Sequence, residues 1–167
     1  MEEITGMIGV NHTMKKKSVK IGALYGVWDA ERSAVLRRSR YNAISHAAGT
    51  PGSPQVRNKA TIVGNVCRAS SANLISPLTA LGTKAKIVGD GPERVVKVEE
   101  MLPGPGRTIP DEGKTATELK VSEMPGYTGC AYYKLSSRRS LDPAVVGVAV
   151  MMGTDPKHTV SVSMWLR

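Results

Sequence analysis

The stretch Ser53-Pro-Gln-Val-Arg-Asn-Lys-Ala-Thr-Ile-Val-Gly-Asn-Val-Cys-Arg-Ala-Ser-Ser-Ala-Asn-Leu-Ile-Ser-Pro77 decides how the chain is organised. Hydroxyl, amide and small side chains crowd it, and such a composition is poorly suited to a packed core. It suits a loop whose backbone N–H groups and short side chains face a polar ligand, and phosphate binding needs such a surface. Many loops of this composition only make turns, so that interpretation stays open. The residues behind the ligand hypothesis are Thr61, Gly64, Asn65, Ser70, Ser71 and Asn73.

Length and composition describe a chain that can bury a hydrophobic core but is short of aromatic residues. It has 167 residues, of which 41% are hydrophobic and 4% aromatic, and Phe is absent. The length suits one domain, or one domain and part of a second. The core must therefore rest on Val, Ile, Leu, Ala and Met.

Basic residues outnumber acidic ones, with 23 Lys and Arg against 14 Asp and Glu, which gives a formal charge of +9. Such an excess suits a nucleic acid, an acidic partner subunit or a phosphate-bearing cofactor. The charges are scattered apart from the run Lys15-Lys16-Lys17, and no zinc-finger spacing or RNA-binding aromatic pair accompanies them. We therefore expect no nucleic acid partner, and a basic nucleic-acid-binding module is a weaker alternative.

Cysteine and histidine usage argues against a disulfide framework or a metal site. Cys67 and Cys130 are the two cysteines, and neither has a second Cys at metal-ligand spacing. The three histidines are isolated from one another, which favours surface or capping roles. No signal peptide or membrane-spanning apolar run is recognisable, so we expect a cytoplasmic protein without metal ligands.

Outside the organising stretch, residue periodicity predicts a mixture of helices and strands. The segments that we expect to be helical are 27–39, 41–48 and 77–81. The segments that we expect to be strands are 19–24, 85–88, 94–98, 118–125, 145–152 and 159–166. Residues 145–152 have no polar side chain, which predicts a strand buried on both faces. Residues 11–17 are expected to form a solvated hairpin or loop, and residues 127–130 a linker.

Four motifs, in the same order, resemble the FAD-binding (medium) subunit of the molybdenum hydroxylases. The first is Gly52-Ser-Pro-Gln-Val-Arg-Asn-Lys-Ala-Thr-Ile-Val-Gly-Asn-Val-Cys67, which leads to a Ser/Asn-rich turn ending in Pro77. Gly104-Pro-Gly-Arg-Thr and Glu118-Leu-Lys-Val-Ser-Glu-Met-Pro follow. Ala131-Tyr-Tyr-Lys-Leu-Ser-Ser-Arg-Arg-Ser-Leu-Asp-Pro-Ala is similar to the opening of the family's C-terminal domain. The family includes carbon monoxide dehydrogenase, xanthine dehydrogenase and 4-hydroxybenzoyl-CoA reductase.

This resemblance implies an α+β fold in two parts. Residues 1–125 would form an incomplete FAD-binding domain of the molybdopterin-dehydrogenase type, a mixed sheet with helices. Residues 126–167 would form the opening hairpin of a C-terminal α+β domain. Family members begin with a segment that carries an Ala-Gly-Gly-Thr/His loop, and nothing before Val19 resembles it. We therefore expect a chain truncated at both ends.

The resemblance also implies FAD as the cofactor. Thr61, Gly64 and Asn65 would contact the pyrophosphate, and Ser71 and Asn73 would lie near the ribose or ribityl hydroxyls. The full set of cofactor-binding residues that it implies is Thr61, Ile62, Gly64, Asn65, Ser71, Asn73, Lys134 and Asp142.

Lys134 and Asp142 would approach the isoalloxazine ring, where a lysine could stabilise negative charge on the reduced ring. Without the resemblance, Lys134, Arg138 and Arg139 would form a solvated basic face, and Asp142 would be a cap or an ion-pair partner. No catalytic residue is expected in either case.

Three substitutions depart from the family pattern. Val63 stands where the family has a glycine, and a positive φ there would cost valine about 1–2 kcal/mol in backbone strain. It would also place a branched side chain near the phosphate oxygens. Asn73 replaces an aspartate, which removes a charged acceptor for a ligand hydroxyl. Pro143 follows Asp142 in place of isoleucine, which removes one backbone donor at the start of a strand.

The function that the resemblance implies is electron transfer within an oxidoreductase. FAD would take electrons from iron–sulfur clusters in a small subunit, which receive them from a molybdopterin-binding large subunit, and an acceptor such as NAD, quinone or oxygen would take them from FAD. We do not expect the chain to be active alone. The alternative is a truncated, non-catalytic remnant that binds FAD weakly or not at all.

Overall fold

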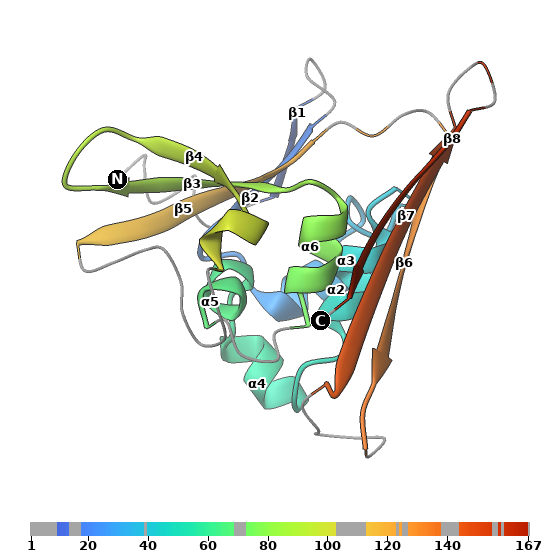
Figure 1. Cartoon of the computed structure of the whole chain (residues 1–167). Helices are drawn as coiled ribbons and strands as arrows, with labels where there is room; N and C mark the ends of the chain where they lie inside the picture. The colour runs from blue at the N-terminus through green and yellow to red at the C-terminus, as the bar shows by residue number, and fades with distance from the viewer. Residues whose placement is uncertain are drawn as a thin grey trace.

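The computed structural model consists of two antiparallel β-sheets with short helices packed between them (Figure 1). It describes residues 10–13, 18–38, 40–68, 73–102, 113–122, 124, 127–137, 144–154, 157 and 159–166. Ala, Val, Leu and Ile dominate the buried core, as the shortage of aromatic residues requires.

The first sheet has five strands and is covered by helices on one face. Its strands are β1 (Val10–Thr13), β2 (Ser18–Gly22), β3 (Lys84–Gly89), β4 (Arg94–Lys97) and β5 (Lys114–Val121), in the order β1-β2-β5-β3-β4. Apolar residues at alternate positions of β2 and β5, such as Val19 and Leu119, are fully buried. The strands expected at 85–88 and 94–98 are confirmed, and they pair with each other as β3 and β4.

The helices are short. They are α2 (Val27–Arg32), α3 (Asn42–Ala48), α4 (Pro54–Lys59), α5 (Ile62–Cys67) and α6 (Ile75–Ala80), and a 3₁₀ turn, η2, covers Glu99–Met101. The helix expected over 27–39 is wrong beyond Arg32, because Ser33 leaves the helical conformation and its Oγ accepts a hydrogen bond from the Leu36 backbone N–H. The helix expected over 41–48 is confirmed from Asn42, and it ends before Gly49.

The expectation of a loop over 53–77 is also wrong for the described residues of this range, most of which belong to α4, α5 and the start of α6. Ser53 is the N-cap of α4, where its side chain accepts a hydrogen bond from the Val56 N–H, and Pro54 occupies the first turn. Thr61 caps α5 in the same way. Hydroxyl side chains satisfy the free N–H groups of a first helical turn, and proline is favoured there. The polar residues of this stretch therefore begin helices instead of forming one long loop.

The second sheet has three strands, β6 (Tyr127–Leu135), β7 (Val146–Thr154) and β8 (Val160–Leu166), in that order. The linker expected at 127–130 is wrong, because these residues begin β6 and pair with β7. The strands expected at 145–152 and 159–166 are confirmed, and they pair with each other as β7 and β8. Helices α3 and α6 contact one face of this sheet. The expected burial of β7 on both faces is wrong, since its burial alternates along the strand.

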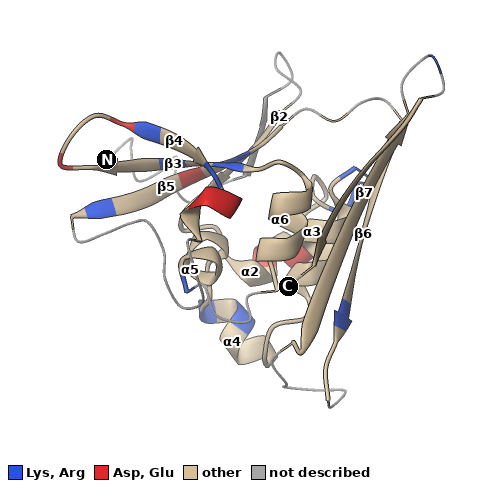
Figure 2. Ribbon diagram, viewed as in Figure 1, with Lys and Arg blue, Asp and Glu red and all other residues tan. Residues whose placement is uncertain are grey.

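Charged residues are scarce in this second sheet. Lys134 in β6 is the one charged residue within the three strands, and Figure 2 shows the remainder of their length in tan. Its side chain points to the face that carries the helices, because Tyr132, two residues earlier in β6, and Gly147, its register partner in β7, are buried there. The opposite face of the described strands therefore has no charged side chain.

Several sequence features lie outside the described residues. They include the Lys15-Lys16-Lys17 run, the Gly104-Pro-Gly-Arg-Thr motif, the Ser70-Ser71 pair, and the segment with Arg138, Arg139, Asp142 and Pro143.

The close approach of β3 and β5 at Gly89 generates a stability prediction. A Cβ at Gly89 would collide with the Gly113 carbonyl oxygen and would lie 2.8 Å from the Lys114 Cα. Both atoms belong to the backbone and cannot rotate away. We expect Gly89→Ala to lower the free energy of unfolding by about 1–3 kcal/mol in a urea titration.

Gly129→Ala in β6 is the matched control. No atom lies within 4 Å of a Cβ built at Gly129, so this substitution should change the same free energy by less than about 0.5 kcal/mol. An equal loss in the two variants would contradict the prediction.

Candidate functional site

A two-residue bridge fixes the position of the start of α5, where four of the expected cofactor-binding residues lie. Gly26 and Thr61 form an isolated antiparallel bridge. The Val27 N–H donates to the Ala60 carbonyl at 2.9 Å, and the Ile62 N–H donates to the Tyr25 carbonyl at 3.0 Å. The first turn of α5 is therefore fixed against the segment that precedes α2.

The first turn of α5 is compact and polar. Thr61 Oγ1 accepts a hydrogen bond from the Gly64 N–H at 3.1 Å, and Gly64 itself is exposed. A Cβ at Gly64 would lie 2.8 Å from Thr61 Oγ1, so a larger residue would displace the cap. The surface at Gly64 is thus bare backbone, which a ligand can approach closely.

Val63 and Ile62 face the interior. Val63 is helical and 5% exposed, so the strain and the obstruction expected from a valine at this position do not arise. Ile62 has a fully buried side chain, and its N–H already donates to Tyr25. These two residues hold α5 against the core, and the part of this turn that solvent can reach is Thr61, Gly64 and Asn65.

Asn65 in α5 contacts Leu74, the N-cap residue of α6, and Asn73 directly precedes that residue. Asn65 Oδ1 accepts a hydrogen bond from the Leu74 N–H at 3.4 Å. Asn73, the preceding residue, is 6% exposed, and its Oδ1 has no hydrogen-bond partner in the described part of the chain. A buried amide oxygen without a partner is costly, which makes it a candidate ligand contact. Ser71, expected at the same place, lies outside the described residues.

Lys134 lies on the second sheet and contacts the end of α3. Its Nζ donates to the Thr50 carbonyl at 3.1 Å. The neighbouring strand residue on the same face, Tyr132, is buried, and its ring meets His46 edge-on at 6.3 Å. Asp142, expected beside Lys134 at a ligand, lies outside the described residues.

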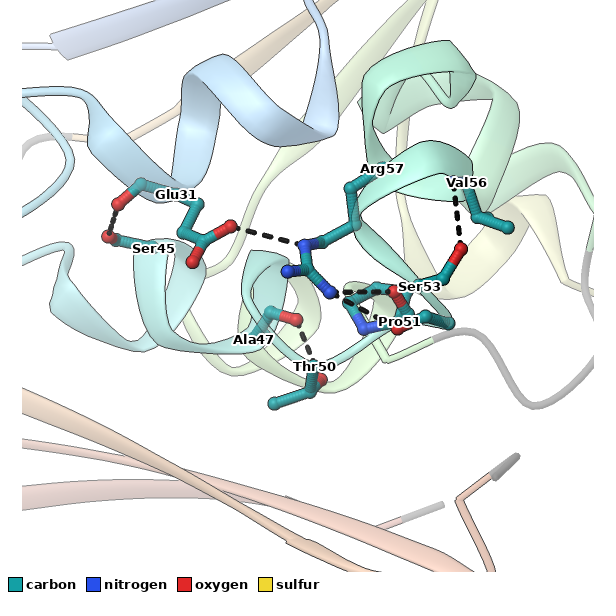
Figure 3. Close-up of polar contacts among 9 residues, drawn as sticks. Glu31, Ser45, Ala47, Thr50, Pro51, Ser53, Val56 and Arg57 are labelled. Carbon is teal, nitrogen blue, oxygen red and sulfur yellow. Dashed lines mark hydrogen bonds and ion pairs between the residues drawn. The ribbon is translucent and has the colours of Figure 1, made fainter. Parts of the chain in front are cut away.

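Arg57 in α4 contacts both α2 and the turn that precedes α4 (Figure 3). Its Nε lies 3.2 Å from Glu31 Oε2 in α2, and its side chain is 13% exposed. One terminal nitrogen donates to the Pro51 and Gly52 carbonyls at 3.3 and 3.1 Å. Sequence reasoning assigned no role to this pair, although Arg57 stands in the first motif of the resemblance.

Trp28 adds an aromatic contact to this cluster. The Arg32 guanidinium lies 3.6 Å from the Trp28 ring centroid, and that of Arg57 lies 5.7 Å from it. Cations over an aromatic face are attracted by its quadrupole. Trp28 therefore holds two arginines close together despite their like charge.

Burial raises the pKa of two thiols and one tyrosine hydroxyl. It raises the pKa of the Cys67 thiol and of the Cys130 thiol, and the latter rise is partly offset by the Ala43 N–H, which donates to Cys130 Sγ at 3.1 Å. Burial also raises the pKa of the Tyr132 hydroxyl, and the Thr50 hydroxyl offsets part of that rise. These groups stay protonated at neutral pH, which makes nucleophilic thiolate chemistry unfavourable.

The arrangement at α5 and α6 is suited to binding and offers little for bond-breaking chemistry. It presents bare backbone at Gly64, a hydroxyl at Thr61 and amide oxygens at Asn65 and Asn73. Among the described residues, no group of three or more His, Cys, Asp or Glu could hold a metal ion. None of the described helices is long and apolar enough to span a membrane.

Comparison with known proteins identifies relatives along most of the chain. Residues 1–121 match the family model described as the FAD binding domain in molybdopterin dehydrogenase. The chain is 29% identical to the nicotinate dehydrogenase FAD-subunit of Eubacterium barkeri over 85% of its length and 49% of that protein. It is 31% identical to the carbon monoxide dehydrogenase medium chain of Hydrogenophaga pseudoflava over 81% of its length and 47% of that protein.

A solved structure of a related protein has the same fold. Carbon monoxide dehydrogenase from Hydrogenophaga pseudoflava, in a form that lacks the Mo-pyranopterin moiety of the molybdenum cofactor, superposes with a TM-score of 0.86 at 26% identity. The match covers 97% of this chain and 55% of the other. The chain thus spans about half the length of the relatives that it matches.

The contacts of Arg57 predict that substitution of this residue strongly lowers the free energy of unfolding. Arg57→Ala would leave Glu31 without its ion-pair partner and two carbonyls without a donor, so we expect the free energy of unfolding to fall by about 2–4 kcal/mol. Arg57→Lys keeps the charge but not the planar fork, and should give an intermediate loss. Urea unfolding measures both.

The control is Lys97→Ala. Lys97 pairs with Glu99 at 3.1 Å, and both side chains are well exposed. Solvent screens such a pair, so this substitution should leave the unfolding transition nearly unchanged. An Arg57→Ala variant as stable as Lys97→Ala would show that the cluster does not hold the helices.

The raised pKa values predict the direction of the alkaline pH dependence. Above about pH 8.5 the unfolded chain releases its thiol protons while the folded chain keeps them, so the free energy of unfolding should fall as pH rises. Below that pH the contribution is fully present. Urea unfolding between about pH 7 and 10 should show a shallower fall in Cys67→Ala/Cys130→Ala than in the parent. Identical slopes would contradict this assignment.

Proposed function

Because the chain belongs to the family of FAD binding domains in molybdopterin dehydrogenases, we propose that it binds FAD and acts as an electron-transfer subunit of a molybdenum hydroxylase. The family and the α+β fold expected from the sequence are confirmed by this match and by the structural superposition. The names of the relatives, FAD-subunit and medium chain, support a role as one subunit among several. Its partners would be a molybdopterin-binding large subunit and an iron–sulfur small subunit.

The observation that carries this proposal is the buried Asn73 Oδ1, which has no hydrogen-bond partner in the part of the chain that the structure describes. A buried amide oxygen without a hydrogen-bond donor lowers the stability of the folded chain. A ligand that donates a hydrogen bond to this oxygen would remove that cost. A hydroxyl of FAD is a suitable donor. Gly64 and the Thr61 cap fit the same cofactor, because the bare backbone allows close approach of a pyrophosphate.

Each residue would contribute by binding and orientation. Thr61 holds the Gly64 N–H in place, and Asn65 fixes the α6 entrance through the Leu74 N–H, so both shape the surface on which the cofactor would lie. Asn73 would accept a hydrogen bond from the cofactor. When bound, FAD supplies the electron-carrying chemistry, and the protein binds, orients and tunes it. Contacts of Ser71, Lys134 and Asp142 with FAD stay predictions.

The two sheets support the proposed division of the chain. We assign residues 1–125 to the FAD-binding domain and residues 126–167 to the start of a second domain. Each sheet consists of strands from only one of these ranges. Strands β1 to β5 pair only with one another, and so do β6 to β8.

One observation favours the alternative, a remnant with weak FAD binding. Asn65 Oδ1, the Ile62 N–H and the Lys134 ammonium all make contacts within the protein, so the fold already uses these polar groups. Titration of the purified chain with FAD separates the two functions. No binding at millimolar FAD would overturn the proposal and favour the remnant.

The Asn73 assignment predicts that binding and stability separate. We expect Asn73→Leu to weaken FAD binding about tenfold in a calorimetric titration, the loss of one hydrogen bond. The free energy of unfolding should stay equal or rise, because an unsatisfied buried oxygen is removed.

Thr83→Val is the matched control. Thr83 Oγ1 is also buried without a partner, but it lies at the start of β3. This variant should be as stable as the parent or more stable, and should bind FAD with unchanged affinity. Equal FAD affinities of Asn73→Leu and Thr83→Val would remove Asn73 from the site.

A further inference from the structure

Four lysines lie side by side across the five-stranded sheet. Lys20 of β2 is opposite Lys120 of β5. Lys84 of β3 is opposite Lys120 on one side and opposite Lys97 of β4 on the other. Residues directly opposite each other in an antiparallel sheet point to the same face. We call these four residues the lysine row. Neighbouring strands lie about 4.8 Å apart, so the row is about 14 Å long.

The lysine row points away from the helices. Leu119 and Ala85, which adjoin two of the lysines in sequence, are fully buried on the face that the helices cover. Because side chains alternate between the two faces of a strand, the lysines point to the opposite face. Lys84 and Lys120 are exposed, and the side chains of the other two lysines are 44% and 56% exposed. The ammonium groups are therefore accessible to a partner.

The lysine row works against the stability of the sheet. Like charges directly opposite each other destabilise a pair of strands, and the row contains three such pairs. Glu118 and Glu99 compensate the two end lysines, each with a nitrogen–oxygen distance of 3.1 Å. Lys84 and Lys120, in the middle, make no hydrogen bond or ion pair with any described residue. A local arrangement that opposes folding is typical of a functional surface.

The surroundings of the row favour the carboxylates of a protein over the phosphates of a nucleic acid. None of the described strands of this sheet contains Phe, Tyr or Trp, on which a base could stack. Glu118 lies on the same face, and Glu93 pairs with Lys86 at 2.8 Å. These two carboxylates would repel a continuous line of phosphates, whereas a protein can place its acidic groups opposite the lysines alone.

The spacing of the row favours a helical partner. The lysines repeat about every 4.8 Å, the distance between neighbouring strands. Side chains three or four residues apart on one face of an α-helix are about 5–6 Å apart. Side chains on one face of an extended strand repeat only about every 6.7 Å. A helix that lies across the strands therefore matches the row better than an extended segment does.

We propose that the lysine row binds an α-helix of another polypeptide that carries Asp or Glu at every third or fourth position. The helix lies across β2, β5, β3 and β4, and its carboxylates pair with Lys84 and Lys120 in the middle of the row. Binding removes the repulsion that the unpaired lysines cause in the free sheet. This inference rests on the five-stranded sheet and does not depend on the proposed binding of FAD.

NMR titration of the isotope-labelled full chain tests the proposal with three synthetic peptides. The first is an alanine-based helix with glutamate at every third or fourth position, the second has glutamine at those positions, and the third has the same composition as the first with its glutamates consecutive. We expect the first peptide to bind most tightly and to shift amide signals of β2 to β5. Its affinity should fall between about 0.02 and 0.2 M salt, because salt screens exposed charges.

The double variant Lys84→Gln/Lys120→Gln separates binding from stability. We expect it to bind the first peptide about threefold to tenfold more weakly, because two exposed ion pairs are lost. Its midpoint in urea should stay equal or rise, because two like charges no longer face each other. A purely structural role of these lysines would instead lower the midpoint.

The double variant Lys59→Gln/Arg37→Gln is the matched control. It removes the same charge from two exposed positions outside the sheet. Its affinity for the first peptide should differ from that of the parent by less than about twofold. FAD affinity should be the same in both double variants, so failure of this proposal and failure of FAD binding are distinguishable.

Three outcomes would overturn the proposal. Equal binding of the first and second peptides would show that the row does not recognise carboxylates. Equal weakening by the two double variants would show that total charge, and not the row, controls binding. Tighter binding of an oligothymidylate with the same number of charges would assign the row to a nucleic acid.

Discussion

The arrangement of the helices depends on the Arg57 guanidinium. Helix α4 buries none of its side chains, so hydrophobic packing does not hold it. Arg57 joins it to α2 through Glu31 and to the preceding turn through two backbone carbonyls. A planar group with five N–H donors can make these contacts together, which an ammonium cannot. Because α5 follows α4 after two residues, this polar cluster also fixes where Thr61 and Gly64 lie.

The candidate FAD site shares its residues with the fold. Thr61 caps α5, and Asn65 satisfies the N–H of Leu74, so substitution of either residue would change stability and binding together. Asn73 differs from both, because its buried oxygen has no hydrogen-bond partner among the described residues. A buried polar group that lowers the stability of the folded chain is typical of a binding site.

The two faces of the second sheet carry different kinds of residues. Gly147 and Ala149 of β7 are buried on the side that α6 contacts, and Val148 and Val150 point to the other side. Lys134 and Tyr132 lie on the side of the sheet that faces the helices, and the opposite face of the described strands has no charged side chain.

The sequence by itself determined the family, most strands and α3, because these depend on local order, alternation and motif sequence. It could not predict the helices within 53–77. Ser53 and Thr61 act as caps only when tertiary contacts stabilise helices of six residues, which are too short to be stable alone. It also could not show that Asn73 is buried without a partner, or which face of β8 turns outward. Only the tertiary structure decided these points, because burial and facing depend on which distant segments pack together.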